Sequence, residues 1–227
     1  MTDIAKALQK VRTRIADAAK ACGRLPTEIT LLAVSKTKPV KSIREAHAAG
    51  QNAFGENYLQ DALPKIAELR DLGLEWHYIG RIQSNKTRDI AQNFAWVHGI
   101  DKLKHAQRLD SQRPDDLAPL QCCIQVNLSG EQSKGGVNAT ELPSLARAIA
   151  DLPQLRLRGL MTMPDPHSSR EEQAQVFAQL ARLKEQLKAE GLALDTLSMG
   201  MSGDLELAIA AGSTLVRVGT DIFGARN

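Results

Sequence analysis

The 227-residue sequence contains few aromatic residues, few cysteines and no strong excess of one charge. Phenylalanine, tryptophan and tyrosine together make up 4% of the residues, and the formal net charge is +3. No block of basic residues interleaved with aromatic residues occurs. A nucleic-acid-binding role is therefore not indicated.

The three cysteines, Cys22, Cys122 and Cys123, form no C-x-x-C pair, so neither a disulfide framework nor a zinc site is favoured. They fit small buried side chains in a reducing compartment. The sequence also lacks an apolar signal segment after Met1 and any apolar run near the ~20 residues that span a bilayer. We therefore expect a cytoplasmic protein that does not bind a membrane.

What the sequence does contain is a regular alternation of short apolar segments and amphipathic segments. The apolar segments are typical of buried parallel strands, and the amphipathic ones are typical of helices. Strands are predicted near residues 31, 53, 76, 96, 124, 157, 197 and 216. With no break in composition, this pattern predicts one α/β domain over residues 1–227, a (β/α)8 TIM barrel. A helix over residues 3–22 precedes the first strand and is expected to cover one end of the fold.

Lys36 follows the first predicted strand, which begins at Leu31 and runs through Val34. The carboxyl ends of barrel strands are where ligands bind. A lysine partly removed from water at such a position is a nucleophile for an aldehyde. On this residue alone the alternative stays open that Lys36 is an ordinary surface lysine whose stem covers apolar residues.

Two glycine-containing loops follow the seventh and eighth predicted strands, where barrels often bind a phosphate. The first loop, Gly200–Gly203, provides the hydroxyl of Ser202, and the second contains Gly219 and Thr220. Glycines allow backbone N–H groups to approach an oxyanion, and hydroxyls add further donors. Either loop by itself is equally typical of an ordinary tight turn.

Arg217, on the last predicted strand, is expected to point into the barrel mouth or interior. A buried arginine stays charged and needs an acceptor. One interpretation pairs it with a carboxylate such as Glu56 or Asp204. The other places it against the ring nitrogen of a pyridine cofactor.

Several ordered segments resemble one family over nearly the full length of the chain. They are Ala33-Val34-Ser35-Lys36-Thr37, Phe54-Gly55-Glu56-Asn57-Tyr58, Trp76-His77-Tyr78-Ile79-Gly80, Gln83-Ser84-Asn85-Lys86, Gly159-Leu160-Met161, Leu197-Ser198-Met199-Gly200-Met201-Ser202 and Val216-Arg217-Val218-Gly219-Thr220-Asp221. On these segments the chain resembles the pyridoxal phosphate homeostasis protein family. The resemblance implies a barrel similar to the N-terminal domain of bacterial alanine racemase, with pyridoxal 5′-phosphate (PLP) held on Lys36 as a Schiff base.

The same resemblance implies the remaining cofactor contacts. Ser202, Gly219 and Thr220 would hold the phosphate, and Arg217 would face the pyridine nitrogen. Asn57 and Met199 would line the ring pocket. The sequence departs from the family at Gly203, where many members have an acidic or other polar residue, and we expect this to alter loop flexibility more than phosphate binding.

The resemblance and the chemistry of Arg217 both favour a PLP-binding protein without catalytic turnover of its own. An arginine beside the ring nitrogen disfavours the pyridinium form and weakens the ring as an electron sink. Racemases of this fold take a second acid/base from a further domain and a partner subunit, whereas this sequence ends at Asn227. We therefore expect a monomer that serves intracellular PLP (vitamin B6) homeostasis, with PLP-requiring apoenzymes as recipients.

Two other functions stay open at this point. One is a weakly active PLP-dependent amino-acid racemase or deaminase, with Tyr58, His77 or Lys38 as the base. The other is a barrel that binds a different phosphate compound. The histidines His47, His105 and His167 have no ligand-spaced partners, so they are expected at the surface and no metal site is predicted. The loop over residues 129–136, which contains Lys134, is a candidate lid.

Overall fold

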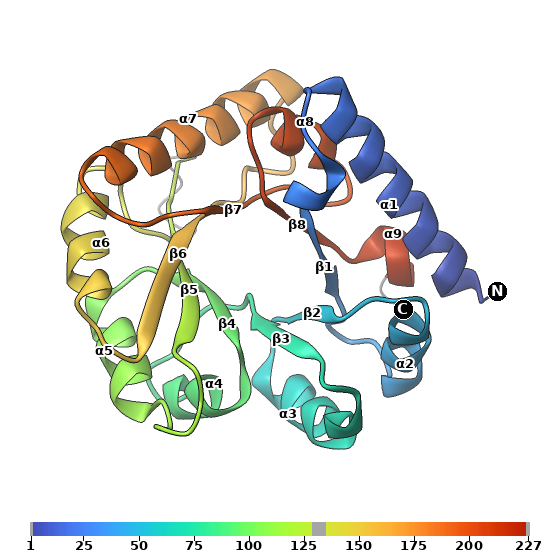
Figure 1. The fold of residues 1–227 in the computed structure, drawn as a ribbon, viewed down its shortest axis with the longest axis horizontal. Coiled ribbons are helices and arrows are strands. Elements are labelled where there is room, and N and C mark those ends of the chain that lie inside the picture. Colours follow the sequence, from blue (N-terminus) through green and yellow to red (C-terminus); the bar gives the residue numbers. More distant parts are fainter. Residues whose placement is uncertain (1, 129–134, 226–227) are drawn as a thin grey trace.

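The structure is a computed structural model that describes residues 2–128 and 135–225. Its centre is a closed barrel of parallel strands in which each strand pairs with its sequence neighbours and β8 pairs with β1 (Figure 1). The strands are β1 (Thr30–Val34), β2 (Ala53–Glu56), β3 (Glu75–Tyr78), β4 (Trp96–Ile100), β5 (Leu120–Gln125), β6 (Leu155–Met161), β7 (Thr196–Ser198) and β8 (Leu215–Val218). The prediction of a (β/α)8 barrel is confirmed.

Helices surround the barrel and alternate with its strands (Figure 1). They are α1 (Asp3–Ala21), α2 (Val40–Ala48), α3 (Leu59–Glu68), α4 (Thr87–Asn93), α5 (Leu103–Gln112), α6 (Leu142–Ala150), α7 (Arg170–Ala189), α8 (Leu205–Ala210) and α9 (Thr220–Phe223). The first helix, α1, packs against α2, α8 and α9 in the outer ring, so the expectation that it covers one end of the fold is wrong. The reason is that α8 and α9 have only six and four residues, and α1 completes the ring beside them.

Strand β1 has one face toward the barrel interior and the other toward the surrounding helices. Successive side chains of a strand point to opposite faces of the sheet. Thr30 and Val34 line cavities at the two ends of the barrel interior. Ala33, between these positions in the alternation, is fully buried in the apolar core that includes the surrounding helices. Both faces of the strand are therefore covered, which explains its continuous apolar run.

The helix ends follow local capping chemistry. Thr2 Oγ1 accepts a hydrogen bond from the Ala5 N–H at 3.2 Å at the start of α1. Ser169 and Glu172 form a reciprocal capping box at the start of α7. Gly50, beyond the end of α2, has a φ of 81°, which is the left-handed conformation that commonly ends a helix.

Two local expectations differ from the structure. His105 is buried, since it lies one turn from Asp101 with its Nδ1 atom 3.4 Å from Asp101 Oδ1. Cys22 follows the last residue of α1 and is exposed, whereas the other two cysteines are buried. Most of the candidate lid, residues 129–134, lies outside the described residues.

Candidate functional site

A cavity of about 250 Å³, here named the mouth cavity, opens at the carboxyl ends of the barrel strands. It lies at the end of the barrel where ligands bind in this architecture. The residues that line it come from β1 and β8 and from the segments that follow other strands. They are Val34, Lys36, Lys38, Asn57, Ile79, Met163, Met201, Ser202, Gly203, Arg217, Gly219, Thr220 and Gly224.

Most of the residues predicted to bind a cofactor meet at this cavity. They are Lys36, Asn57, Ser202, Arg217, Gly219 and Thr220. Met199 is fully buried in the apolar core and is not among the described residues that line the cavity. The preceding Ser198 contacts His98 inside the barrel, so strand alternation turns Met199 toward the helices. Met201 lines the cavity instead.

Lys36 lies at the start of a tight turn beyond β1. The next residue, Thr37, has a φ of 62°, a left-handed conformation that is uncommon for threonine. The N–H of Thr37 donates to Asp61 Oδ2 at 2.8 Å, which fixes the turn against α3. This contact holds the backbone that carries Lys36 at the mouth cavity.

A buried ion pair supports the same turn. Lys65 Nζ, on α3, donates to the carbonyl oxygen of Ser35 at 3.0 Å, to Glu56 Oε1 at 2.9 Å and to Asp61 Oδ2 at 2.7 Å. Ser35 Oγ donates to the same Glu56 oxygen at 2.7 Å. Burial raises the pKa of Glu56, and Lys65 and Ser35 oppose this shift. The amine of Lys65 is therefore committed to structural contacts beneath Lys36.

Arg217 reaches the mouth cavity from β8 and is only 4% exposed. Its Nη1 donates to the carbonyl oxygen and Oγ of Ser198 at 2.6 and 2.7 Å, and Nη2 donates to the carbonyl oxygen of Thr162 at 3.0 Å. A guanidinium has five N–H groups, so two remain for a ligand. Burial lowers the pKa of Arg217 to about 10, which leaves it protonated at neutral pH. Among the described residues it forms no ion pair with Glu56 or Asp204.

The loops after β7 and β8 present polar groups that the protein itself does not use. The hydroxyls of Ser202 and Thr220 make no hydrogen bond to another described residue. The Oδ1 atom of Asn57 is buried and likewise has no hydrogen-bond partner in the described part of the chain. Gly219 lies so close to Val34 that a Cβ atom would be 3.1 Å from its carbonyl oxygen. The free hydroxyl donors beside Gly219 suit an anionic ligand, whereas the Asn57 oxygen can only accept a hydrogen bond.

Arg14, on α1, ties the two loops together. Its Nη2 donates to the carbonyl oxygen of Ser202 at 2.9 Å, and its Nε lies 2.8 Å from Glu206 Oε1 on α8. A further ion pair joins it to Asp221 on α9. The hydrogen bond to Glu206 is the largest contribution that raises the pKa of Arg14. One guanidinium thus fixes both loops relative to each other.

Sequence reasoning missed Arg14, Thr162 and Ser198. No motif in α1 indicates which later loops that helix meets, so Arg14 carried no usable signal. Thr162 contributes a backbone carbonyl oxygen, which any residue could provide. Ser198 could have been found, because counting alternate positions along β7 places it on the same inner face as Thr196.

The three candidate bases lie in different parts of the fold. Tyr58 is 54% exposed and does not line the mouth cavity among the described lining residues. His77 is buried and lines a cavity at the opposite end of the barrel. Lys38 lines the mouth cavity, and its Nζ donates to the carbonyl oxygen of Ala225 at 2.9 Å.

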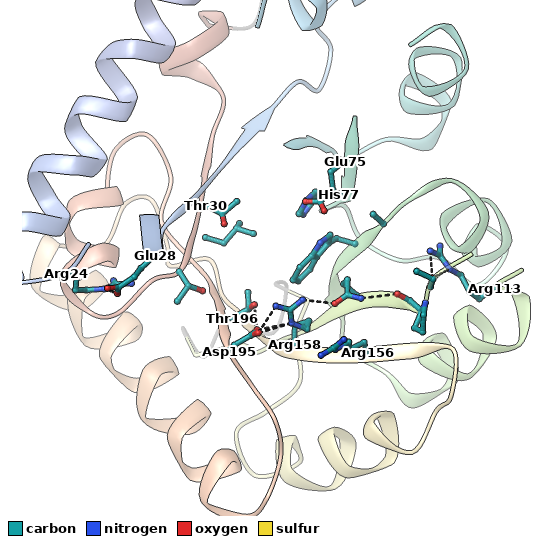
Figure 2. Close-up of a pocket in the computed structure, with 17 residues that line it drawn as sticks. Arg24, Glu28, Thr30, Glu75, His77, Arg113, Arg156, Arg158, Asp195 and Thr196 are labelled. Carbon is teal, nitrogen blue, oxygen red and sulfur yellow. Dashed lines mark hydrogen bonds and ion pairs between the residues drawn. The ribbon is translucent and has the colours of Figure 1, made fainter. Parts of the chain in front are cut away.

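The second cavity, here named the base cavity, has a volume of about 750 Å³ and opens where the strands begin (Figure 2). Its charged side chains are largely paired with protein groups. Arg158 Nη2 lies 2.6 Å from Asp195 Oδ2, and the Arg158 guanidinium stacks over Trp96 at 5.1 Å from the ring centroid. Arg113 donates to backbone carbonyl oxygens, including that of Ala118 at 2.7 Å.

Two features are absent from residues 2–128 and 135–225. No helix in these ranges combines the length and apolar character required to cross a membrane. No group of three or more His, Cys, Asp or Glu side chains in the same ranges is arranged to ligate a metal ion.

Comparison with known proteins gives three likenesses besides a family match. The model of the alanine racemase N-terminal domain matches residues 7–227. The pyridoxal phosphate homeostasis protein of Pseudomonas aeruginosa is 59% identical over 227 residues, covering 100% of this chain and 97% of that protein. PipY of Synechococcus elongatus, solved with PLP bound, is 39% identical with a TM-score of 0.87, covering 98% of this chain and 100% of PipY. Alanine racemase from Corynebacterium glutamicum is 20% identical with a TM-score of 0.69, over 96% of this chain and 62% of the racemase, which shows a shared fold.

Proposed function

The chain belongs to the pyridoxal phosphate homeostasis protein family, within the fold of the alanine racemase N-terminal domain, and we propose that it binds PLP in the mouth cavity and serves intracellular vitamin B6 homeostasis. The observation that carries the proposal is the set of groups on this one cavity. They are the side chain of Lys36, the two unused N–H groups of Arg217 and the hydroxyls of Ser202 and Thr220. These groups match the aldehyde, the ring nitrogen and the phosphate of one PLP molecule.

Each part of PLP has a partner of suitable chemistry. Lys36 would hold the aldehyde carbon covalently. Arg217 would donate to the ring nitrogen, and the buried Asn57 Oδ1 atom would accept from a ring hydroxyl. Ser202 and Thr220, with the backbone at Gly219, would hold the phosphate. Met201, which lines the cavity, takes the wall position that the sequence suggested for Met199.

The same residues favour storage of PLP over catalysis. Bound PLP supplies an electron sink that stabilises carbanions. Arg217 opposes this use, because a guanidinium that stays protonated donates a hydrogen bond to the ring nitrogen but does not give it a proton. The relatives' designation as homeostasis proteins rather than enzymes supports a carrier role.

Covalent binding is tested by reduction of the PLP-loaded protein with borohydride, followed by peptide mass spectrometry. We expect a yellow protein whose absorption is bleached, with one PLP added to the peptide that contains Lys36. Lys36→Ala should abolish the adduct. Lys38→Ala is the matched control, because Lys38 lines the same cavity and should leave the adduct in place. A wild-type protein that stays colourless with excess PLP would overturn the proposal.

The alternative of a weak amino-acid racemase or deaminase has one observation in its favour, since Lys38 is an amine on the mouth cavity itself. It is tested with PLP-loaded protein, D- and L-alanine and deuterated water. A carrier leaves the α-hydrogen in place, whereas a racemase exchanges it for deuterium. Exchange that is lost in Lys38→Ala would establish the enzymatic alternative.

We further propose that the protein acts as a monomer and passes PLP to apoenzymes. The transfer is tested by mixing the PLP-loaded protein with an apo-aminotransferase and following recovery of its activity. Trapping released PLP with a semicarbazide separates direct transfer, which continues, from release into solution, which stops. Sedimentation analysis measures the oligomeric state.

A further inference from the structure

A row of hydrogen bonds crosses the barrel interior from the base cavity to Arg217. Glu75 Oε1 lies 2.8 Å from His77 Nε2, and His77 Nδ1 lies 2.9 Å from His98 Nε2. His98 Nδ1 lies 2.8 Å from Ser198 Oγ, which accepts from Arg217 Nη1 at 2.7 Å. Glu75 and His77 line the base cavity (Figure 2), whereas Arg217 lines the mouth cavity. Glu75, His77, His98 and Ser198 are here named the interior chain.

The direction of donation along the interior chain follows from its two ends. Arg217 can only donate, so the Ser198 oxygen accepts from it and the serine proton goes to His98 Nδ1. His98 then carries its proton on Nε2 and donates to His77 Nδ1. His77 in turn carries its proton on Nε2 and donates to the Glu75 carboxylate. Both imidazoles are neutral, and every donor in the row points from the arginine toward the carboxylate.

The surroundings support neutral imidazoles. His77 is 1% exposed and His98 is fully buried, and burial lowers the pKa of both. The charged groups around them are Glu75 on β3, Arg217 on β8, Arg158 on β6 and Asp195 just before β7, which is paired with Arg158. Two further neighbours are uncharged: Trp96 on β4 stacks on His77 at 5.3 Å, and burial raises the pKa of Cys123 on β5 to about 12.

We propose that the interior chain positions the Arg217 guanidinium in the mouth cavity and makes its hydrogen bonding depend on the charge of Glu75 at the opposite end of the barrel. The proposal rests on the proposed function in that Arg217 faces the ring of bound PLP. Its four members are positioning residues, since none of them lines the mouth cavity among the described residues. They act on PLP through Arg217 alone.

The physical basis is that an additional proton cannot bind to the neutral imidazoles of the interior chain unless its hydrogen bonds rearrange. An imidazolium at His98 would donate to Ser198 Oγ, and the serine proton would then have no acceptor among the described contacts of Ser198. It would also place a positive charge near the Arg217 guanidinium, with only the Ser198 hydroxyl between them, in a buried environment. The Glu75 carboxylate favours an imidazolium only at His77, to which it is hydrogen-bonded, so the ionised carboxylate sets where the row takes up a proton. Loss of the Glu75 charge makes proton uptake harder.

The first test concerns the protein without PLP, so that it does not depend on the proposed function. Imidazole nitrogen chemical shifts at pH 7.5 should show His77 and His98 neutral, both with the proton on Nε2. Ser198→Ala should alter the Nδ1 shift of His98, and Ser198→Thr, which restores the hydroxyl, should return it. A proton on Nδ1 of either histidine at this pH would overturn the assigned direction.

The second test uses pyridoxine 5′-phosphate, which keeps the ring and phosphate of PLP but has no aldehyde, so lysine chemistry does not enter. Ser198→Ala should weaken its binding about fivefold, the effect of one lost buried hydrogen bond, and Ser198→Thr should restore it. Glu75→Gln should move the acid limb of the affinity profile to lower pH. Thr196→Val, two residues from Ser198 on the same strand, is the control and should leave both quantities unchanged.

The outcomes separate the two proposals. If no ligand binds to the wild-type protein but the imidazole shifts are as expected, the cofactor assignment fails and the interior chain stands. If the ligand binds and Glu75→Gln leaves the pH profile superimposed on that of the wild type, the coupling through the chain is wrong. A fall in stability of Glu75→Gln without a shift of the profile would likewise reduce the chain to a structural role.

Discussion

The cavities at the two ends of the barrel differ in volume and in unused hydrogen-bonding capacity, and the larger cavity has less of this capacity. The base cavity, at about 750 Å³, is three times as large as the mouth cavity, at about 250 Å³. At the base, Arg158 is paired with Asp195, and Arg113 donates to carbonyl oxygens through Nε and both Nη atoms. At the mouth, hydroxyl, amide and guanidinium groups have capacity that the described protein groups do not use. Unused hydrogen-bonding capacity, rather than volume, therefore distinguishes the ligand site.

The comparison assigns stability to the base and binding to the mouth, as is usual for the two faces of this barrel. The interior chain is the part of the molecule that joins them. Substitutions at the base outside the interior chain should therefore change the free energy of unfolding and leave PLP binding intact. Substitutions at the mouth should do the reverse.

The largest effect is expected from Arg113→Ala at the base. Arg113 is 8% exposed and donates to the carbonyl oxygens of Phe94 and Ala118 at 2.8 and 2.7 Å. Without the guanidinium these buried acceptors lose their partners, so we expect a loss of about 3 kcal/mol in the free energy of unfolding. Urea denaturation measures the loss, and PLP titration of the folded variant should match the wild type.

Arg156→Ala is the matched control, because Arg156 lines the same cavity but is exposed. It should change the free energy of unfolding by less than about 0.5 kcal/mol. If Arg113→Ala weakened PLP binding as strongly as it lowered stability, the assignment of stability to the base and binding to the mouth would be wrong.

The next effect comes from the two interior histidines and tests stability against pH. Burial lowers the pKa of His77 and His98 below the ordinary 6.5, so the unfolded chain binds protons that the folded chain excludes. The contribution of these histidines to the free energy of unfolding is fully present above about pH 6.5 and is lost as the pH falls below it. We expect a loss of about 2 kcal/mol between pH 7 and 5. Urea unfolding at pH 7, 6 and 5 measures this slope. A free energy of unfolding that does not fall between pH 7 and pH 5 would contradict the prediction.

At the mouth, Arg14→Ala should weaken PLP binding about tenfold through lost preorganisation of the two loops. Arg14 binds the carbonyl oxygen of Ser202 and the carboxylates of Glu206 and Asp221, so its loss lets both loops move. Pyridoxal, which has no phosphate, should bind the variant and the wild type equally. Arg12→Ala is the control from the same helix, because Arg12 donates to the Ala49 and Gly50 carbonyl oxygens instead.

How far the sequence could predict the molecule follows from the range of the interactions involved. The barrel was predictable because strand and helix periodicities are local. The order of strands and helices then places the residues that follow each strand at the same end of the barrel. The strand β6, for example, spans Leu155–Met161 and includes the expected position 157. The mouth residues Lys36, Arg217 and Thr220 were placed together for the same reason.

The rest could not be predicted because it depends on contacts between distant segments. Arg14 meets Glu206 across 192 positions, and His98 meets Ser198 across 100. Met199 was assigned to the ring pocket by motif, but the inner face at that point belongs to Ser198. A motif identifies a segment of chain, whereas strand alternation decides which of two neighbours reaches the site.

The smallest effect separates the two glycines of the mouth. A Cβ at Gly219 would lie 3.1 Å from the carbonyl oxygen and 3.3 Å from the Cβ of Val34, whereas a Cβ at Gly203 meets nothing within 4 Å. The φ of Gly219 is −119°, outside the left-handed region that favours glycine, so Gly219→Ala should fold. It should push Val34 into the mouth cavity and weaken PLP binding about threefold, or roughly 0.6 kcal/mol. Gly203→Ala, on the same cavity, should bind PLP like the wild type, and equal losses in the two variants would mean that loop flexibility, not close approach, governs the phosphate contact.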